Sequence, residues 1–373
     1  MSRDILICTV GTSLFSNIER LDDKEPLKVY EKKGNITGLV KELLKRNPRD
    51  RVCGAEINSI TSIIEKGKLS ERNELHFLIS HTDEGWEIGE ILKHYYQDSQ
   101  NPYKFERVVA TVIEGLKDYD VKKFKTEGLK NLVKEIAKIV REKGTERIVI
   151  NATGGYKAQT SFAGLIGQAL EIPVMYMFEK FEDIIELPPQ PISFNFDLWL
   201  LHYESLDNLS KKNIAPYEEV KRLTADERLK TLIEVETINE EKHVALTPVG
   251  QLFHEMFLYR FKKEKNHLLG DIQPVKEEPA FSKHFYHNPP FGAETFVKRI
   301  WKDKKYIKTI RDFYTHPDLP ERSRFEFDPK HNKIVLIFSD GRRTAKFNVE
   351  IPSQNEVTLK AALVDLNETY FNG

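Results

Sequence analysis

The sequence has few of the residues that mark secreted, metal-binding or membrane proteins. Its 373 residues include two cysteines, Cys8 and Cys53, which form no metal-ligand spacing and need no disulfide. No segment approaches the ~20 consecutive apolar residues that span a bilayer. The N-terminal Met-Ser-Arg-Asp lacks the charged-then-apolar pattern of a signal peptide. We therefore expect a cytoplasmic protein without a metal site or a membrane anchor.

The chain also lacks an excess of charge of either sign. Its 57 Lys and Arg residues face 58 Asp and Glu residues, so the formal net charge is −1. Such a balance argues against a large footprint on a long phosphate backbone. A hydrophobic content of 40% is normal for a globular protein, and the length predicts two or three domains.

The most informative stretch is residues 151–157, Asn-Ala-Thr-Gly-Gly-Tyr-Lys. It follows an apolar run at 147–150, typical of a buried strand, and precedes a helical pattern at 158–170. Consecutive glycines let the backbone approach a ligand closely, and the start of a helix favours an anion. With the Thr153 hydroxyl and the Lys157 charge, the stretch predicts a phosphate or ribose site. The alternative is an ordinary strand-to-helix turn with a surface lysine.

Two further strands end in similar loops. The continuous apolar run at 5–10 leads into Gly11-Thr-Ser13, and the run at 75–80 leads into residues 81–85, His-Thr-Asp-Glu-Gly. In an open α/β sheet, ligands bind outside the carboxyl ends of the strands, where the strand order reverses. We expect the three loops to converge there.

The first 200 residues alternate between strand and helix patterns. This alternation predicts a doubly wound, parallel α/β sheet whose last strand is antiparallel. We expect strands at 5–10, 52–57, 75–80, 108–113, 147–150, 173–178 and 183–187, and helices at 35–45, 86–96, 122–142 and 158–170.

These loops, together with Glu56-Ile-Asn-Ser59, resemble a CARF domain, the CRISPR-associated Rossmann-fold sensor of type III systems. The resemblance covers residues 1–200 and implies a homodimer whose joined pockets bind a cyclic oligoadenylate as activator, with no other cofactor. The sequence does not give the ring size; four adenylates is the commoner choice and six the alternative. A further possibility is that the cleft cuts its own ligand, with Lys157 and Ser13 nearest the scissile phosphates. The ligand-binding residues that the resemblance implies are Gly11, Thr12, Ser13, Asn58, Ser59, Thr82, Gly85, Thr153, Gly154, Gly155 and Lys157.

Residues 201–270 are predicted to form a second domain. Short helical patterns precede a hairpin at 233–238 and 243–246, and Thr247 and Pro248 begin a closing helix. This order is similar to a winged helix. The helix expected to read DNA has no basic face, so linkage and dimerisation are favoured over DNA contact.

Residues 271–373 are predicted to form a small α+β domain. We expect a basic helix at 296–314, strands at 324–327, 333–338 and 344–351, and a final helix at 358–370. Between 281 and 350, 15 Lys and Arg face 9 Asp and Glu, an excess of +6 that favours an RNA-binding surface over a solvated helix face.

Size, element order and charge make this domain similar to the RelE-type mRNA interferases. The whole chain resembles the CARF–winged-helix–RelE fusions, a resemblance that implies metal-independent cleavage of mRNA on the ribosome, with the ribosomal stalk as a further partner. A 2′-hydroxyl attacks the adjacent phosphate, which requires a proton acceptor, a charge clamp and a proton donor. By residue type, the candidates are Lys305, Arg311, His316, Arg322, Arg324, Arg342, Arg343 and Lys346.

Two other functions stay open for the C-terminal part of the chain. Arg311-Asp-Phe-Tyr-Thr-His316 matches the R-x4-H pattern of HEPN ribonucleases, in which a helical Arg and His act on free RNA. The chain is alternatively a ligand-gated winged-helix transcription factor whose basic C-terminal domain grips duplex DNA with a steep salt dependence.

Overall fold

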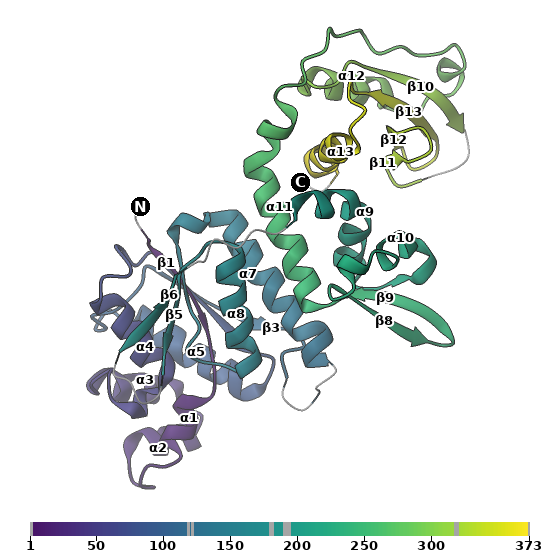
Figure 1. Cartoon of the computed structure of the whole chain (residues 1–373). Coiled ribbons are helices and arrows are strands. Elements are labelled where there is room, and N and C mark those ends of the chain that lie inside the picture. The colour runs from purple at the N-terminus through teal and green to yellow at the C-terminus, as the bar shows by residue number, and fades with distance from the viewer. Residues whose placement is uncertain are drawn as a thin grey trace. The chain divides into compact units, whose positions relative to one another are not determined.

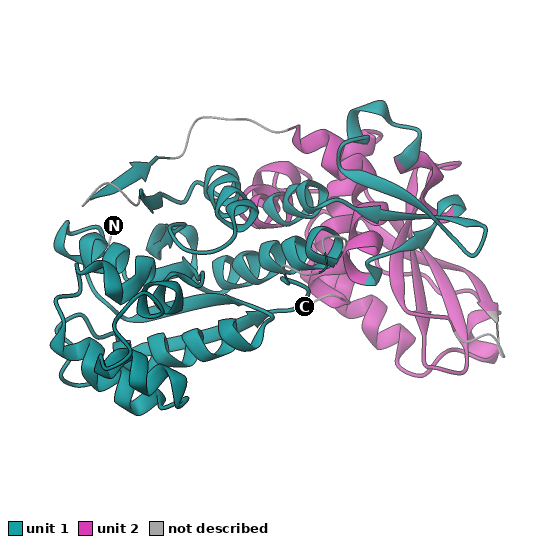
Figure 2. Ribbon diagram, turned by 90° about the horizontal axis from the view of Figure 1, so that it is seen from below, with its two compact units in different colours: residues 1–194, 212–218, 224–256 teal, residues 195–211, 219–223, 257–373 magenta. Residues whose placement is uncertain are grey.

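The computed structural model describes residues 3–117, 120, 123–178, 183–188, 195–316 and 321–371, with the side chain of His316 left out. The chain divides into two compact units, shown in Figure 2. Unit 1 comprises residues 1–194, 212–218 and 224–256, and unit 2 comprises residues 195–211, 219–223 and 257–373. We describe each unit separately.

Unit 1 is built on a mixed sheet that runs β3-β2-β1-β4-β5-β6 through its described strands (Figure 1). The first five are parallel, and β6 pairs antiparallel with β5, as predicted. This is the strand order of Rossmann sheets, and it reverses between β1 and β4. The strands are β1 (Ile5–Thr9), β2 (Glu74–Ser80), β3 (Arg107–Ile113), β4 (Ile148–Asn151), β5 (Val174–Met177) and β6 (Ile184–Leu187).

Helices accompany the strands of this sheet, which confirms the predicted doubly wound α/β architecture. Leu6 and Cys8 of β1 pack into one continuous core with the apolar faces of the first five helices, while α7 and α8 pack against each other, with α7 contacting β3 and α8 contacting β1 and β5. The helices are α1 (Ser13–Ile18), α2 (Pro26–Lys32), α3 (Ile36–Lys45), α4 (Gly54–Glu65), α5 (Asp83–Gln97), α7 (Leu129–Lys143) and α8 (Lys157–Ala169).

The predicted strand at 52–57 is wrong, because Val52 and Cys53 lie in a short 3-10 helix and residues 54–57 begin helix α4. Ile57, Ile60 and Ile63 are fully buried and recur every three residues, a helical rather than an alternating spacing. The short apolar run Val52–Ile57 does not distinguish the two periods by itself. The correction moves Glu56 from a strand to the first turn of a helix.

The predicted middle domain, residues 201–270, contributes to both units. Its small sheet β7-β9-β8 is antiparallel and belongs to unit 1, whereas helix α9 belongs almost entirely to unit 2. The winged-helix resemblance therefore stays a prediction. The elements are α9 (Phe196–Lys212), β7 (Ala215–Pro216), α10 (Lys221–Thr224), β8 (Ile233–Ile238), β9 (Glu241–Leu246) and α11 (Pro248–Leu269).

Unit 2 contains an antiparallel sheet in the order β10-β13-β12-β11. Helix α13 packs on β11 and β12, and Phe325 of β11 lies 5.4 Å from the ring of Phe371 at the end of α13. Arg324, the neighbouring residue on β11, consequently faces the other side of the sheet. The elements are α12 (Ala293–Asp303), β10 (Thr309–His316), β11 (Arg324–Asp328), β12 (Lys333–Ser339), β13 (Thr344–Glu350) and α13 (Glu356–Tyr370).

The predicted helix at 296–314 is wrong in its second half. The helix α12 ends at Asp303, and residues from Thr309 form strand β10, which pairs with β13. Ile307 and Ile310 are fully buried, and the pairing with β13 satisfies the backbone of this segment as a strand. Arg311 of the R-x4-H pattern therefore lies on a strand, so the pattern lacks the helical setting that the HEPN resemblance requires.

Within the described ranges, no helix combines the length and apolar character that a membrane crossing demands.

Candidate functional site

The loops after β1 and β4 meet where the strand order of unit 1 reverses. A Cβ placed on Gly11 would lie 2.6 Å from the backbone nitrogen of Gly155, so the two loops touch through their backbones. The Thr9 hydroxyl, at the end of β1, donates a 2.6 Å hydrogen bond to the Gly154 carbonyl. Of the three loops predicted to converge, these two therefore meet in the structure, whereas no residue of 81–85 lies with them in the site.

A buried carboxylate holds both loops from beneath. Glu56, in the first turn of α4, accepts hydrogen bonds from the Gly11 amide at 2.7 Å and from the Ser13 hydroxyl at 3.2 Å. The Ser13 Oγ in turn accepts one from the Ala55 amide at 2.8 Å. A Cβ on Gly154 would lie 1.9 Å from Glu56 Oε1. The carboxylate thus bonds the start of α4 to the Gly11 loop and lies directly against Gly154, so residue 154 has no room for a side chain.

A second hydrogen-bond chain fixes the Thr-Gly-Gly loop to its neighbours. The Thr153 hydroxyl donates to Asn151 Oδ1 at 2.7 Å and accepts from the Met177 amide at 3.0 Å. Asn151 Nδ2 donates to Ser59 Oγ at 2.8 Å. The Thr153 proton and the buried Ser59 hydroxyl are therefore engaged within the fold, where they position the loop.

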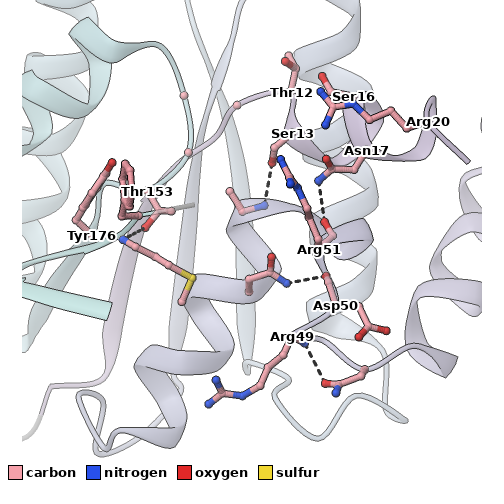
Figure 3. Close-up of a pocket in the computed structure, with 18 residues that line it drawn as sticks. Thr12, Ser13, Ser16, Asn17, Arg20, Arg49, Asp50, Arg51, Thr153 and Tyr176 are labelled. Carbon is pink, nitrogen blue, oxygen red and sulfur yellow. Dashed lines mark hydrogen bonds between the residues drawn. The ribbon is translucent and has the colours of Figure 1, made fainter. Parts of the chain in front are cut away.

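A cleft of about 940 Å³ opens over these loops. A volume of this size lies at the upper end of typical ligand pockets. In Figure 3, Thr153 and Tyr176 lie on one side of the cleft, opposite Ser16, Asn17 and Arg20. Of the residues predicted to bind ligand, those that line it are Gly11, Thr12, Ser13, Asn58, Thr153, Gly154 and Gly155.

The remaining predicted ligand residues lie outside the lining. The Thr82 hydroxyl caps α5 by accepting from the Gly85 amide at 3.0 Å, so both residues complete that helix start. Ser59 is fully buried below the cleft. Lys157 begins α8 and is exposed, and within the described residues no hydrogen bond or ion pair holds its ammonium group.

Arginines around the cleft were missed from the sequence. Arg20, Arg49 and Arg51 line it, and Arg49 is paired with Glu65. The guanidinium groups of Arg20 and Arg51 have no partner among the described residues. Asn58 donates to the carbonyls of Pro48 and Asp50 at 2.6 and 2.9 Å, which fixes the segment that carries two of these arginines. The predicted strand at 52–57 gave no reason to expect residues 49–51 near the cleft. They lie beside α1 because residues 54–65 form helix α4 instead.

Burial raises the pKa of Glu56, although its hydrogen bonds from Gly11 and Ser13 act in the opposite direction. In the unfolded chain the Glu56 carboxyl loses its proton as the pH rises through 4.5. In the folded protein, where the pKa is raised, it keeps this proton to a higher pH. Its contribution to stability is therefore complete below pH 4.5 and is lost as pH rises through the folded-state pKa.

We expect the unfolding free energy of the wild type, measured relative to that of Glu56→Gln, to fall over that interval. Urea unfolding of both proteins between pH 4.5 and 8 measures the difference. Parallel curves would contradict a raised pKa at this carboxyl.

The catalytic candidates of unit 2 include two that share one sheet face. Register places Tyr314, Lys346, Ile337 and Arg324 in a row across the sheet. Glu321 contacts Lys346 at 3.1 Å and Arg324 at 3.5 Å, and Glu326 contacts Arg324 at 2.5 Å. Carboxylates thus occupy the predicted charge clamp, which sequence reasoning missed.

The other candidates are spread over the unit. Arg311 pairs with Glu277 at 2.9 Å and Glu350 at 3.1 Å. Lys305 precedes β10, near the end of β13, whereas Arg342 and Arg343 lie in the turn that begins β13. That strand has seven residues, so its ends are about 20 Å apart, and Lys305 does not share a site with Arg342 and Arg343.

Two candidates need separate mention. Arg322 lies just before β11, and its carbonyl accepts a 2.8 Å hydrogen bond from Arg324 Nη1. The side chain of His316 lies outside the described residues. Among the residues that are described, no group of three His, Cys, Asp or Glu is placed to hold a metal ion.

Comparison with known proteins gives one family. Residues 51–190 match the family described as CRISPR-associated protein (Cas_APE2256), so this part of the chain is similar to a CRISPR-associated protein. The match includes Glu56, the 151–157 stretch and Tyr176, and it covers less than half of the chain. No curated protein matches the sequence.

Solved structures are similar only at a low level. Can2 from Sulfobacillus thermosulfidooxidans, in complex with cyclic tetra-adenylate, is 10% identical over 74% of this chain and 68% of its own, with a TM-score of 0.24. Enterococcus italicus Csm6, bound to cyclic hexa-2′-fluoro-hexa-dAMP, is 10% identical over 73% and 59%, with a TM-score of 0.29. Protein VC1899 from Vibrio cholerae is 11% identical over 72% and 70%, with a TM-score of 0.24.

Proposed function

We propose that unit 1 is a CARF-type sensor that binds a cyclic oligoadenylate, with cyclic tetra-adenylate as the first ligand to test. The observation that carries the proposal is the cleft over the two glycine loops at the reversal point of the sheet. It combines polar loops with two arginines that have no partner in the described chain, a composition suited to several phosphates and riboses. The similarity of residues 51–190 to a CRISPR-associated family supports it.

The sensor is proposed to work as a homodimer that controls a ribonuclease in the C-terminal part of the chain. Two copies of the cleft would face one ring. On the sheet of unit 2, Arg324 and Lys346 would hold the scissile phosphate, and the neighbouring Glu321 would accept the proton of the attacking 2′-hydroxyl. As the bond between the 2′-oxygen and phosphorus forms, the bond to the 5′-oxygen would break, and this leaving oxygen would take a proton from water. No step in this chemistry requires a metal. The proposed substrate is mRNA on the ribosome.

Loss of the cleft cations is expected to weaken ligand binding. Arg20→Ala and Arg51→Ala each remove a charge in the cleft lining that no described residue neutralises, so the fold loses no ion pair while the ligand loses a phosphate partner. We expect about a tenfold rise in Kd for each variant, the usual size for one charge-assisted contact. Calorimetric titration with cyclic tetra-adenylate measures the change.

Lys41→Ala is the matched control for the cleft variants. Lys41 is an exposed lysine on α3 outside the cleft lining, so this variant keeps the wild-type Kd. Unchanged Kd values in both cleft variants would refute the site. Thr153→Ala is a less clean test, because it also removes the acceptor of the Met177 amide.

The proposed ribonuclease activity is tested by measuring RNA cleavage with and without cyclic tetra-adenylate. The full-length protein is incubated once with naked RNA and once with mRNA programmed in ribosomes. Ligand-dependent cleavage restricted to ribosomes supports the RelE-type reaction. Ligand-dependent cleavage of naked RNA keeps the ribonuclease but excludes the ribosome as a requirement, and steeply salt-dependent binding to duplex DNA without cleavage would favour a transcription factor.

A further inference from the structure

Phe291 of unit 2 is an aromatic residue with no role in the core. Its side chain is 89% exposed, the largest value among the large apolar side chains that the structure describes. It lies in the Asn288-Pro-Pro-Phe-Gly292 loop, just before α12. A single exposed apolar residue is common on protein surfaces, so its surroundings decide whether it has a use.

The loop that carries Phe291 is fastened to the turn between β12 and β13. The Phe291 amide donates to Asp340 Oδ2 at 2.8 Å, and the amides of Arg342 and Arg343 donate to Asp340 Oδ1 at 2.9 and 2.8 Å. The Arg343 guanidinium donates to the Pro289 carbonyl at 3.3 Å. One carboxylate and one arginine therefore bind the loop and the turn together.

This fastening holds near neutral pH. Hydrogen bonds from the backbone amides of Arg343, Phe291 and Arg342 lower the pKa of Asp340 to about 2. The carboxylate consequently stays ionised, and its oxygens stay directed at the three amides. The backbone of Phe291 is thus ordered before any partner arrives, which reduces the entropic cost of binding through its ring.

The charges on the turn that holds the loop indicate the kind of partner. Asp340 is saturated by backbone donors and Arg343 is engaged with Pro289, whereas the exposed Arg342 side chain has no partner in the described chain. Phe291 and Arg342 are bound through their backbone amides to one carboxylate, so the aromatic ring and the available guanidinium leave neighbouring backbone positions. Such a pair suits a nucleobase with its phosphate. A protein partner would instead favour an apolar surround, and here the neighbours are charged residues, two prolines and a glycine.

We propose that Phe291 and Arg342 form a single-strand RNA contact, in which the ring stacks on one base and the guanidinium binds an adjacent phosphate. This contact deepens the proposed ribonuclease function and rests on it for the choice of RNA. The Phe291–Arg342 contact lies at the end of the sheet where β13 begins. It would therefore position the RNA rather than take part in the cleavage reaction.

The test measures binding separately from cleavage. Full-length protein is titrated into a single-stranded RNA that carries 2′-O-methyl groups, so that no 2′-hydroxyl can attack, and 2-aminopurine as the fluorescent base. Stacking on Phe291 quenches this base. Phe291→Ala should remove the quench and weaken binding about tenfold, Phe291→Leu should also remove it, and Phe291→Trp should restore it.

The arginine contact has its own readout. Arg342→Gln should make the slope of log affinity against log salt less negative by about 0.7, the value for one phosphate of a single strand. Val275→Ala is the control, because Val275 is 87% exposed in the same unit and should bind as the wild type does.

Wild-type affinity and quench in Phe291→Ala would overturn the contact, as would failure of the wild type to bind this RNA. Ligand-dependent cleavage by the wild type in the separate activity assay would still uphold the ribonuclease. Conversely, a quench that depends on Phe291 in a protein that never cleaves RNA would retain the contact and reject the proposed function.

Discussion

Gly154→Ala should weaken the binding of cyclic tetra-adenylate by at least about tenfold and destabilise unit 1 by about 1–3 kcal/mol. The reason is steric: a Cβ at this position would lie 1.9 Å from Glu56 Oε1 and 3.0 Å from the Thr9 carbonyl oxygen. Glu56 is buried and hydrogen-bonded, so it cannot swing into solvent. The methyl group must push the loop out of the cleft. Calorimetric titration and urea unfolding measure both effects.

Gly164→Ala is the matched control for this glycine substitution. Gly164 lies in helix α8, seven residues after the loop ends at Lys157, and a Cβ there would meet nothing within 4 Å. Alanine favours a helix over glycine by about 1 kcal/mol, so this variant should be slightly more stable and bind the ligand normally. Equal ligand affinity in Gly154→Ala and Gly164→Ala would show that the loop does not need its close approach to Glu56.

Glu56→Ala should be the most damaging single change in the cleft region. It leaves the Gly11 amide and the Ser13 hydroxyl without their acceptor and opens a cavity below the loops. A buried donor without a partner costs about 1–3 kcal/mol, and we expect a loss of about 3 kcal/mol in unfolding free energy at pH 5, together with loss of measurable ligand binding. Chemical denaturation and titration test this.

Glu56→Gln separates the shape of this side chain from its charge. The amide oxygen of Gln can still accept from Gly11, so binding and stability at pH 5 should stay within about 1 kcal/mol of the wild type. If Gln fails as completely as Ala, the carboxylate charge is required, and the positioning role assigned to Glu56 is incomplete. If Ala binds the ligand normally, that role is wrong.

The sequence predicted the sheet of unit 1 well because its strands are continuous apolar runs bounded by glycine or polar loops. The runs at 5–10, 75–80 and 108–113 each became a strand within one residue of the expected bounds. It failed at 52–57 and at 309–314, where short segments mix apolar and polar residues. There the period is ambiguous, and pairing or burial against distant residues selects helix or strand.

The residues of the candidate site likewise divide into those that local sequence predicted and those that only the structure revealed. The glycine loops at Gly11 and at 154–155 could be found from local chemistry, since consecutive glycines between a strand and a helix require little context. Thr82 looked equivalent, yet its strand β2 lies on the other side of β1 from β4, so its loop lies away from the reversal point. The arginines at 20, 49 and 51 carry no motif and reach the cleft only through the packing of α1 and α4.

By itself, the sequence determined the α/β class of the first 200 residues, the two glycine loops and the basic character of the C-terminal part, because each depends on neighbours along the chain. The tertiary structure decided which loops meet, that Glu56 joins them from below, and that carboxylates occupy the predicted clamp of Arg324 and Lys346. These facts depend on pairs such as Gly11 and Glu56, 45 residues apart. Such contacts leave no local pattern, because folding alone brings the partners within hydrogen-bond distance.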